Sequence, residues 1–142
     1  NGVGQMVTNV TRMAKPGEVD VLRLWSHGSS GGQGVSTGFP DARFSVRGQR
    51  AGISQSSLPD ISTDIKRLAP YFSKRGRLEL RGCSVGVGDD GPRLLRALAE
   101  LVGTDVYAAL NAQPIGPIQW AGPVVRMRPD GSSTTGSGPD IR

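Results

Sequence analysis

The fold class is decided by residues 77–110, "RLELRGCSVGVGDDGPRLLRALAELVGTDVYAAL". The first part, residues 77–83, is rich in apolar residues and predicts a buried strand. A glycine-rich turn follows, and residues 91–103 predict a helix because leucines recur at helical spacing and a glycine ends the run. Residues 104–110 predict another strand. Strands that alternate with helices favour an α/β fold with a mainly parallel sheet.

The chain upstream of this stretch continues the same alternation. Residues 2–14 carry apolar residues at helical spacing and predict a short helix, and residues 19–25 predict a buried strand. Residues 58–72 predict a further helix, whose end is weakened by a proline. Residues 29–57 are rich in Gly and Ser and predict an irregular surface excursion with a small hairpin.

The C-terminal part predicts a hairpin and then a tail. Residues 117–131, "PIQWAGPVVRMRPDG", indicate two strands that turn near Gly122 and Pro123. The last residues, 131–142, are too polar to pack and predict a disordered tail or linker. We therefore expect a single domain over residues 1–130.

Composition limits the classes of function. The chain has 142 residues, 36% of them hydrophobic, which is enough for one domain with a core. The formal net charge of +5 could attract anions, but the basic residues are scattered, so we expect no nucleic acid as a partner. No stretch approaches the roughly 20 apolar residues of a membrane span. No signal peptide is visible, and a chain that starts at Asn1 leads us to expect a domain of a longer protein.

Residues 81–92, "RGCSVGVGDDGP", contain two signals that point to different kinds of site. Three glycines spell G-x-G-x-x-G, the pattern of a dinucleotide-binding turn, and they precede a helix as such a site requires. Directly before them lies Cys83, the only cysteine in the chain. The stretch is therefore either a phosphate-binding turn or a loop that presents a nucleophile. The three glycines are Gly86, Gly88 and Gly91.

Two features weigh against nucleotide binding. A dinucleotide site needs an acidic residue at the end of the next strand, and that position falls near Leu110 and Asn111. Asp89 and Asp90 would also lie beside the pyrophosphate and repel it. A lone glycine pattern in a chain with 21 glycines is weak evidence, so nucleotide binding is the less favoured alternative.

The nucleophile interpretation rests on Cys83 together with His27, the only histidine. A thiol attacks as the thiolate and needs a base or a positive end of a helix nearby. Cys83 precedes a helix, and His27 follows the first predicted strand just as Cys83 follows the second. If those strands are parallel neighbours, both side chains emerge at the same edge of the sheet. Gly28 adds a backbone N–H that is free of side-chain bulk, as an oxyanion donor should be.

These motifs resemble those of a known family. "LRLWSHGSSG", residues 22–31, followed by "LELRGCSVG", residues 78–86, is similar to the caspase-like cysteine peptidases, including the bacterial clostripain-like, toxin self-processing and CHAT-type domains. The interval between His and Cys also matches the roughly 50 residues known for caspases. The resemblance implies a three-layer α/β/α sandwich with a mainly parallel sheet, completed here by the C-terminal hairpin.

The resemblance also implies roles for individual residues. Cys83 becomes the nucleophile and His27 the general base and acid, and the backbone N–H groups of Gly28 and Cys83 form the oxyanion hole. The family's reaction is hydrolysis of peptide bonds through a thioester, with a protein or peptide as substrate. The residue pair Arg81-Gly82 stands where caspases have Gln-Ala, so aspartate specificity does not follow. We expect no cofactor and no metal, because one cysteine excludes a zinc cluster of thiolates.

Charged and polar residues near the predicted strand ends are candidates for binding the substrate. They are Arg23, Arg81, Asp89, Asp90 and Asn111. For each of them a solvated surface position is the alternative interpretation.

A different class of function stays open beside the peptidase. The chain could be a caspase-like module for interaction or structure that catalyses nothing. In either case the resemblance fits a domain of a larger bacterial protein with flanking domains, secreted or delivered as a toxin-like effector.

Overall fold

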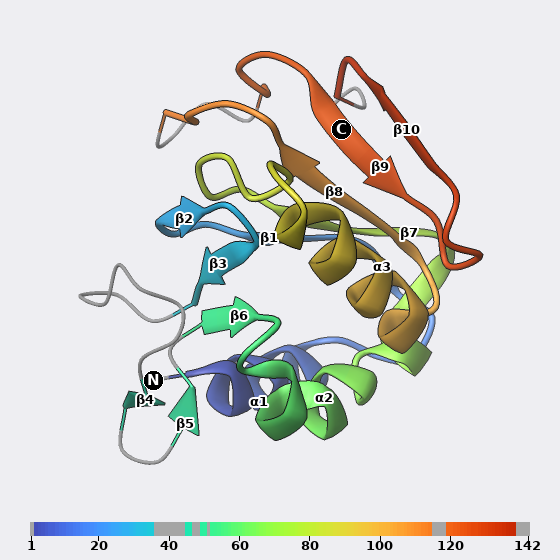
Figure 1. The fold of residues 1–142 in the computed structure, drawn as a ribbon. Coiled ribbons are helices and arrows are strands. Elements are labelled where there is room, and N and C mark those ends of the chain that lie inside the picture. Colours follow the sequence, from blue (N-terminus) through green and yellow to red (C-terminus); the bar gives the residue numbers. More distant parts are fainter. Residues whose placement is uncertain (1, 36–44, 47–48, 51, 115–118, 139–142) are drawn as a thin grey trace.

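The computed structural model describes residues 2–35, 45–46, 49–50, 52–114 and 119–138. Within them a central sheet has the strand order β1-β7-β8-β9-β10 (Figure 1). β1, β7 and β8 run parallel, whereas β9 pairs antiparallel with β8 and β10 antiparallel with β9. The expected α/β fold is confirmed, with a mixed sheet. The strands are β1 (Val19–Leu24), β7 (Phe72–Leu80), β8 (Asp105–Ala109), β9 (Val124–Met127) and β10 (Ser133–Gly136).

The described residues form α-helices close to the predicted positions. They are α1 (Val3–Met13), α2 (Leu58–Lys66) and α3 (Asp90–Val102). The end of α3 follows from its sequence, because Gly103 adopts the left-handed φ of 67° and donates its N–H to Ala99. The helix expected over residues 58–72 is shorter than predicted. It ends at Lys66, and a short 3-10 helix, η1 (Ala69–Tyr71), contains Pro70.

The helices share one face of the sheet. A single core joins buried residues of α1, α2 and α3 with residues from alternate positions of the strands. In Figure 1 the helices group on one side, and the hairpin β9–β10 lies away from α1 and α2. One row of strand partners shows the pattern, since Leu80 pairs with Leu24 on one side and Ala108 on the other, and Ala108 pairs with Val125.

The opposite face of the sheet, which we call the open face, carries polar and charged residues. Its row of partners across β1, β7, β8 and β9 is Arg23, Glu79, Tyr107 and Arg126. Among the described residues no helix covers this face. The expected second helical layer of a three-layer sandwich is therefore absent from the described part of the chain. A helix needs an apolar surface to pack on, and alternate positions of these strands do not provide one.

Residues 29–57, expected as an irregular excursion with a small hairpin, contain most of a second small sheet. β2 (Gly28–Ser29), β3 (Gly32–Gly34) and β6 (Gly52–Ser54) pair antiparallel. β4 (Ser45–Val46) and β5 (Gln49–Arg50) form a separate hairpin. The small sheet is attached to the main core through the fully buried Ile53.

The C-terminal hairpin is present, but it turns at a different place. Its strands are β9 and β10, and the turn lies at 129–131, where Gly131 has a φ of 88°. The expected turn near Gly122 and Pro123 is wrong, because these residues precede β9. The disordered tail expected from residue 131 is also wrong for Ser133–Gly136. These four residues are exposed and polar, yet backbone pairing with β9 holds them in a strand.

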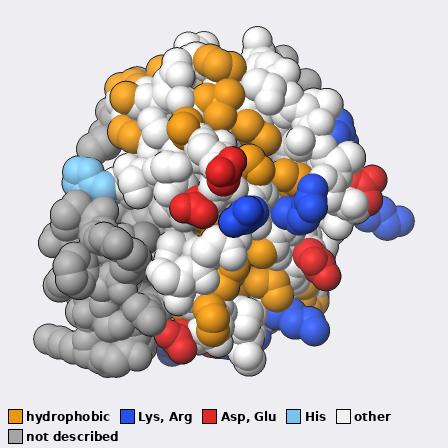
Figure 2. Space-filling model, viewed as in Figure 1, with side chains coloured by type: hydrophobic (Ala, Val, Ile, Leu, Met, Phe, Trp, Pro, Cys, Tyr) orange, Lys and Arg blue, Asp and Glu red, His pale blue; other side chains and the backbone are white. Residues whose placement is uncertain are grey.

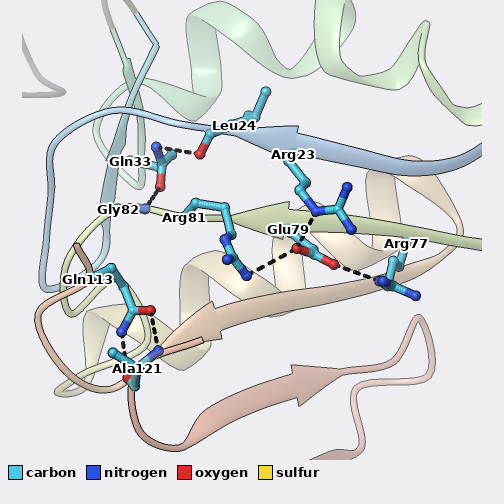
Figure 3. A network of polar contacts seen from close by, with 9 residues as sticks. All are labelled: Arg23, Leu24, Gln33, Arg77, Glu79, Arg81, Gly82, Gln113 and Ala121. Atoms are coloured by element: carbon cyan, nitrogen blue, oxygen red, sulfur yellow. Dashed lines mark hydrogen bonds and ion pairs between the residues drawn. The ribbon is translucent and has the colours of Figure 1, made fainter. Parts of the chain in front are cut away.

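A buried carboxylate organises the open face (Figure 3). The Glu79 side chain is 0% exposed and accepts hydrogen bonds from Arg23 Nε at 3.1 Å, Arg77 Nε at 2.7 Å and Arg81 Nη1 at 3.3 Å. Three guanidinium groups thus share one carboxylate. Without that carboxylate, three positive charges would repel one another across β1 and β7.

We expect Glu79→Gln to lower the free energy of unfolding by about 3–5 kcal/mol, because it leaves the buried guanidinium of Arg81 and the partly buried ones of Arg23 and Arg77 without their counter-charge. Urea denaturation measures the change. The matched control is Asp105→Asn, which removes the charged partner of Arg126. The Arg126 side chain is 43% exposed, so water can solvate its charge. The control should cost no more than about 1 kcal/mol. Equal losses for the two variants would contradict the central role of Glu79.

Candidate active site

His27 and Cys83 follow two adjacent parallel strands, as predicted. β1 and β7 pair with Leu24 opposite Leu80, and the Arg81 N–H donates to the Leu24 carbonyl at 2.9 Å. Beyond this bond, the segments that follow β1 and β7 both leave the sheet at the carboxyl ends of the strands. The two candidate residues therefore lie on loops that start from the same edge.

The two loops touch through their glycines. A Cβ built on Gly28 would lie 2.8 Å from both the Cys83 nitrogen and the Gly82 Cα. A Cβ built on Gly82 would lie 2.8 Å from the Gly28 Cα. Real Cβ atoms do not approach backbone this closely, so only glycine fits at either position. The backbone of Gly28 and the N–H of Cys83, the predicted oxyanion donors, are thereby brought together.

Cys83 lies immediately before a strained residue. Ser84 has a φ of 54° and is the only non-glycine with positive φ in the described part of the chain. This left-handed conformation costs a non-glycine residue roughly 1–2 kcal/mol and is frequent at functional sites. The Ser84 N–H donates to the Asn111 carbonyl at 3.0 Å, which fixes the turn against the end of β8.

The thiol of Cys83 is partly exposed and contacts the loop after β8. The Gln113 N–H donates to the sulfur at 3.2 Å, and the sulfur lies 3.6 Å from the Gln113 carbonyl oxygen. The Gln113 side chain in turn makes two hydrogen bonds to the Ala121 backbone, at 2.7 and 3.0 Å (Figure 3). One glutamine therefore closes this loop and places it against the thiol.

His27 is exposed, and the histidine stands at the molecular surface in Figure 2. Its backbone carbonyl accepts the Gly34 N–H at 2.8 Å. Among the described residues its imidazole makes no hydrogen bond to the thiol. The structure therefore ties the backbone of His27 to β3 and leaves its side chain exposed.

The glycine pattern that suggested a nucleotide site has a structural explanation. A Cβ on Gly91 would lie 2.4 Å from the Gly86 carbonyl carbon, so the start of α3 packs directly on the turn. Gly88 has a positive φ of 75°. The tip of the small sheet also covers this turn, since Ser30 donates its hydroxyl to the Val87 carbonyl at 2.6 Å.

Two of the predicted substrate-binding residues lie on the open face. Arg23 and Arg81 both bind Glu79, and Arg81 is 3% exposed. The Arg81 guanidinium stacks between two rings, 4.7 Å from the centroid of Trp25 and 3.8 Å from that of Trp120. Burial lowers the pKa of Arg81, an effect that Glu79 opposes and the neighbouring arginines strengthen. These contacts favour a structural role for both arginines, and their contact with a substrate stays a prediction.

The other three predicted substrate-binding residues are exposed near the loops. Asp89 directly precedes α3 and makes no capping hydrogen bond with its side chain, and Asp90 lies in the first turn of α3, beside Gly31. Asn111 follows β8 and holds the turn after Cys83 through its carbonyl. The structure therefore brings these residues to the Cys83 loop, and their contact with a substrate also stays a prediction.

Sequence reasoning missed Gln33, which lies in a run of glycines and serines. The side chain is 0% exposed and bonds to backbone groups next to both loops (Figure 3). A single long polar residue in a Gly/Ser-rich segment was the only available signal. Among the described residues, no three His, Cys, Asp or Glu side chains lie together as a metal site would need. No helix in that part of the chain could cross a membrane.

The family model described as "Domain of unknown function (DUF4347)" matches residues 1–122. No curated protein and no solved structure matches the chain.

We expect Gly28→Ala to lower the free energy of unfolding by about 1–3 kcal/mol, because its Cβ would push the two loops apart. Chemical denaturation gives the change. Gly136→Ala is the matched control, since a Cβ there meets no atom within 4 Å. A Gly28→Ala protein as stable as the control would show that the close contact between the loops is not required.

We expect NAD, FAD and ATP to leave the melting temperature unchanged, because the glycine turn packs on its own helix. A ligand present at 100 times its dissociation constant would stabilise the protein by about 2.7 kcal/mol, which a thermal scan resolves. A clear upward shift with any of the three would restore the nucleotide interpretation.

Proposed function

The chain belongs to the DUF4347 family of domains of unknown function, and we propose that it is a cysteine endopeptidase domain with His27 and Cys83 as catalytic dyad. One observation carries the proposal. The loops that bear these residues leave adjacent parallel strands at one edge and touch through Gly28 and Gly82. The sequence resemblance to caspase-like peptidases supports the same pair.

The proposed reaction passes through a thioester. The Cys83 thiolate attacks the carbonyl carbon of the scissile bond, and the oxyanion binds the N–H groups of Gly28 and Cys83. His27, holding the thiol proton, gives it to the leaving amine as the C–N bond breaks. A water then gives a proton to His27 and attacks the thioester, which releases the acid and restores the thiol.

The surroundings of the sulfur fit this chemistry. The Gln113 N–H that donates to the sulfur at 3.2 Å can donate to a thiolate as well as to a thiol. The absence of a bond between the imidazole and the thiol in the described structure does not oppose the dyad, because such bonds often form only with substrate present.

The substrate in this proposal is a protein or peptide. Asn111, Asp89 and Asp90 are exposed next to the Cys83 loop and are the residues placed to meet it. Arg23 and Arg81 act less directly, since both are engaged with Glu79. The setting within a larger secreted or toxin-like bacterial protein with flanking domains belongs to the same proposal.

A non-catalytic module is the second candidate, and a specific contact favours it. The Cys83 sulfur already lies against both backbone groups of Gln113. In this alternative Cys83 anchors the loop after β8, and His27 is a surface residue. The caspase-like arrangement would then serve structure or interaction alone.

We expect Cys83→Ala and His27→Ala each to abolish cleavage of a diverse peptide library while leaving the fold intact. His27→Ala should also slow alkylation of Cys83 by iodoacetamide, because a neighbouring imidazolium holds the thiolate as an ion pair. The double variant should be no worse than either single one, since residues that act as a unit are not additive. Peptide cleavage and alkylation rates are the measurements.

Ser26→Ala, next to the histidine, serves as the control for general disturbance of the loop. If the wild-type protein cleaves nothing and its thiol alkylates equally fast with and without His27, the dyad is refuted. The non-catalytic module would then be the better interpretation.

A further inference from the structure

The buried amide of Gln33, on β3, uses both of its N–H donors and its oxygen at the edge where the two loops begin. Its Nε2 group donates to the Leu24 carbonyl at 3.2 Å and to the Gly34 carbonyl at 2.9 Å. Its Oε1 atom accepts the Gly82 N–H at 2.7 Å. Figure 3 shows the side chain between the ends of β1 and β7. A primary amide has two N–H donors, and both are used here together with the oxygen.

The Gln33 side chain lies where the pairing of β1 with β7 ends. The bond from Arg81 N–H to the Leu24 carbonyl closes the regular pairing of β1 with β7. The next N–H along the chain, that of Gly82, donates to the Gln33 side-chain oxygen. Because Gln33 also donates to the Leu24 carbonyl, it bridges the end of β1 and the segment after β7 at the point where they separate.

The next residue, Gly34, fixes the other loop. Its N–H donates to the His27 carbonyl at 2.8 Å. A Cβ on Gly34 would lie 2.9 Å from that carbonyl oxygen and 2.8 Å from the Ser26 hydroxyl. Two consecutive residues of β3 thus bind the backbone beside both candidate catalytic residues.

We propose that Gln33 and Gly34 are positioning residues that set the separation of His27 and Cys83. They act through the backbone of the two loops and touch no reacting atom. The inference rests on the proposed peptidase function for its effect on rate. Its geometric part, that Gln33 holds the Cys83 loop to β1, can be measured without activity.

The physical reason for an effect on rate is the precision that a dyad needs. A misplacement of about 1 Å can cost 100-fold in rate. Loss of the Gln33 amide leaves the Gly82 N–H without its acceptor and removes the tie between β1 and the start of the Cys83 loop, while the Ser84 N–H still bonds to Asn111. The exposed residues near the substrate are untouched, so kcat should fall while KM changes little.

The variants are Gln33→Met, which keeps the length of the side chain without its hydrogen bonds, and Gln33→Glu. Gln33→Met should lower kcat by about 100-fold at every pH. A buried carboxyl group keeps its proton to higher pH than usual, and its protonated form regains one O–H donor. The kcat ratio of Gln33→Glu to wild type should therefore rise as the pH falls.

The second readout is the hydrogen exchange of backbone amides, measured by NMR. In Gln33→Met the Gly82 amide should exchange at least about 10-fold faster, while amides in the buried centre of α3 keep the wild-type rate. Gln55→Met makes the same replacement at an exposed glutamine and should change neither exchange nor kcat.

The outcomes separate this inference from the proposed function. Unchanged Gly82 exchange in Gln33→Met overturns the inference whatever the activity. Faster exchange with an unchanged kcat also overturns it, because Gln33 would then be structural only. If the wild-type protein cleaves no peptide, the proposed function fails, and faster exchange still supports Gln33 as the bridge between the loops.

Discussion

The candidate site depends on the parallel pairing of β1 with β7. It also depends on how closely the segments that follow these two strands stay together. The bond from the Arg81 N–H to the Leu24 carbonyl closes the ladder, and beyond it the Gly31 N–H donates to the Val85 carbonyl at 3.0 Å, a backbone bond that joins the two loops further out. Contact between Gly28 and Gly82 sets how near they come, and the Gln33 amide sets how far they can part. A side chain at either glycine or a shorter residue at Gln33 changes the geometry of both loops at once.

The same pairing decides the character of the two faces of the sheet. On one face, apolar partners such as Leu24 and Leu80 align and pack against the helices. On the open face, Glu79 gathers three guanidinium groups, and Arg81 lies between Trp25 and Trp120. Trp25 shortly precedes His27 and Arg81 shortly precedes Cys83, so the stack lies at the start of both loops. The strands β1 and β7 therefore carry both the Glu79 cluster of the open face and the start of the loops that bear His27 and Cys83.

Local patterns were sufficient for much of the fold. The helices α1 and α3 and the strands β1 and β8 lie where apolar spacing predicts them, because that spacing reflects which side of an element is buried. The hairpin at the C-terminus was predicted with the wrong turn. Both 122–123 and 129–131 contain Gly and Pro, and only pairing with β8 decides which one is the turn. Ser133–Gly136 was missed because backbone bonds to β9, rather than burial, hold that strand.

The sequence by itself determined that one histidine and one cysteine follow two buried strands, each beside a glycine, and this placed both at one edge. Only the tertiary structure decided what holds them there. The bonds of Gln33 and of Gln113 join segments that lie far apart in the chain. The hydrogen-bond partners of an amide side chain cannot be predicted from the local sequence, because only folding brings a particular N–H or carbonyl within reach. The left-handed turn at Ser84 is fixed in the same way, by the carbonyl of Asn111 at the end of another strand.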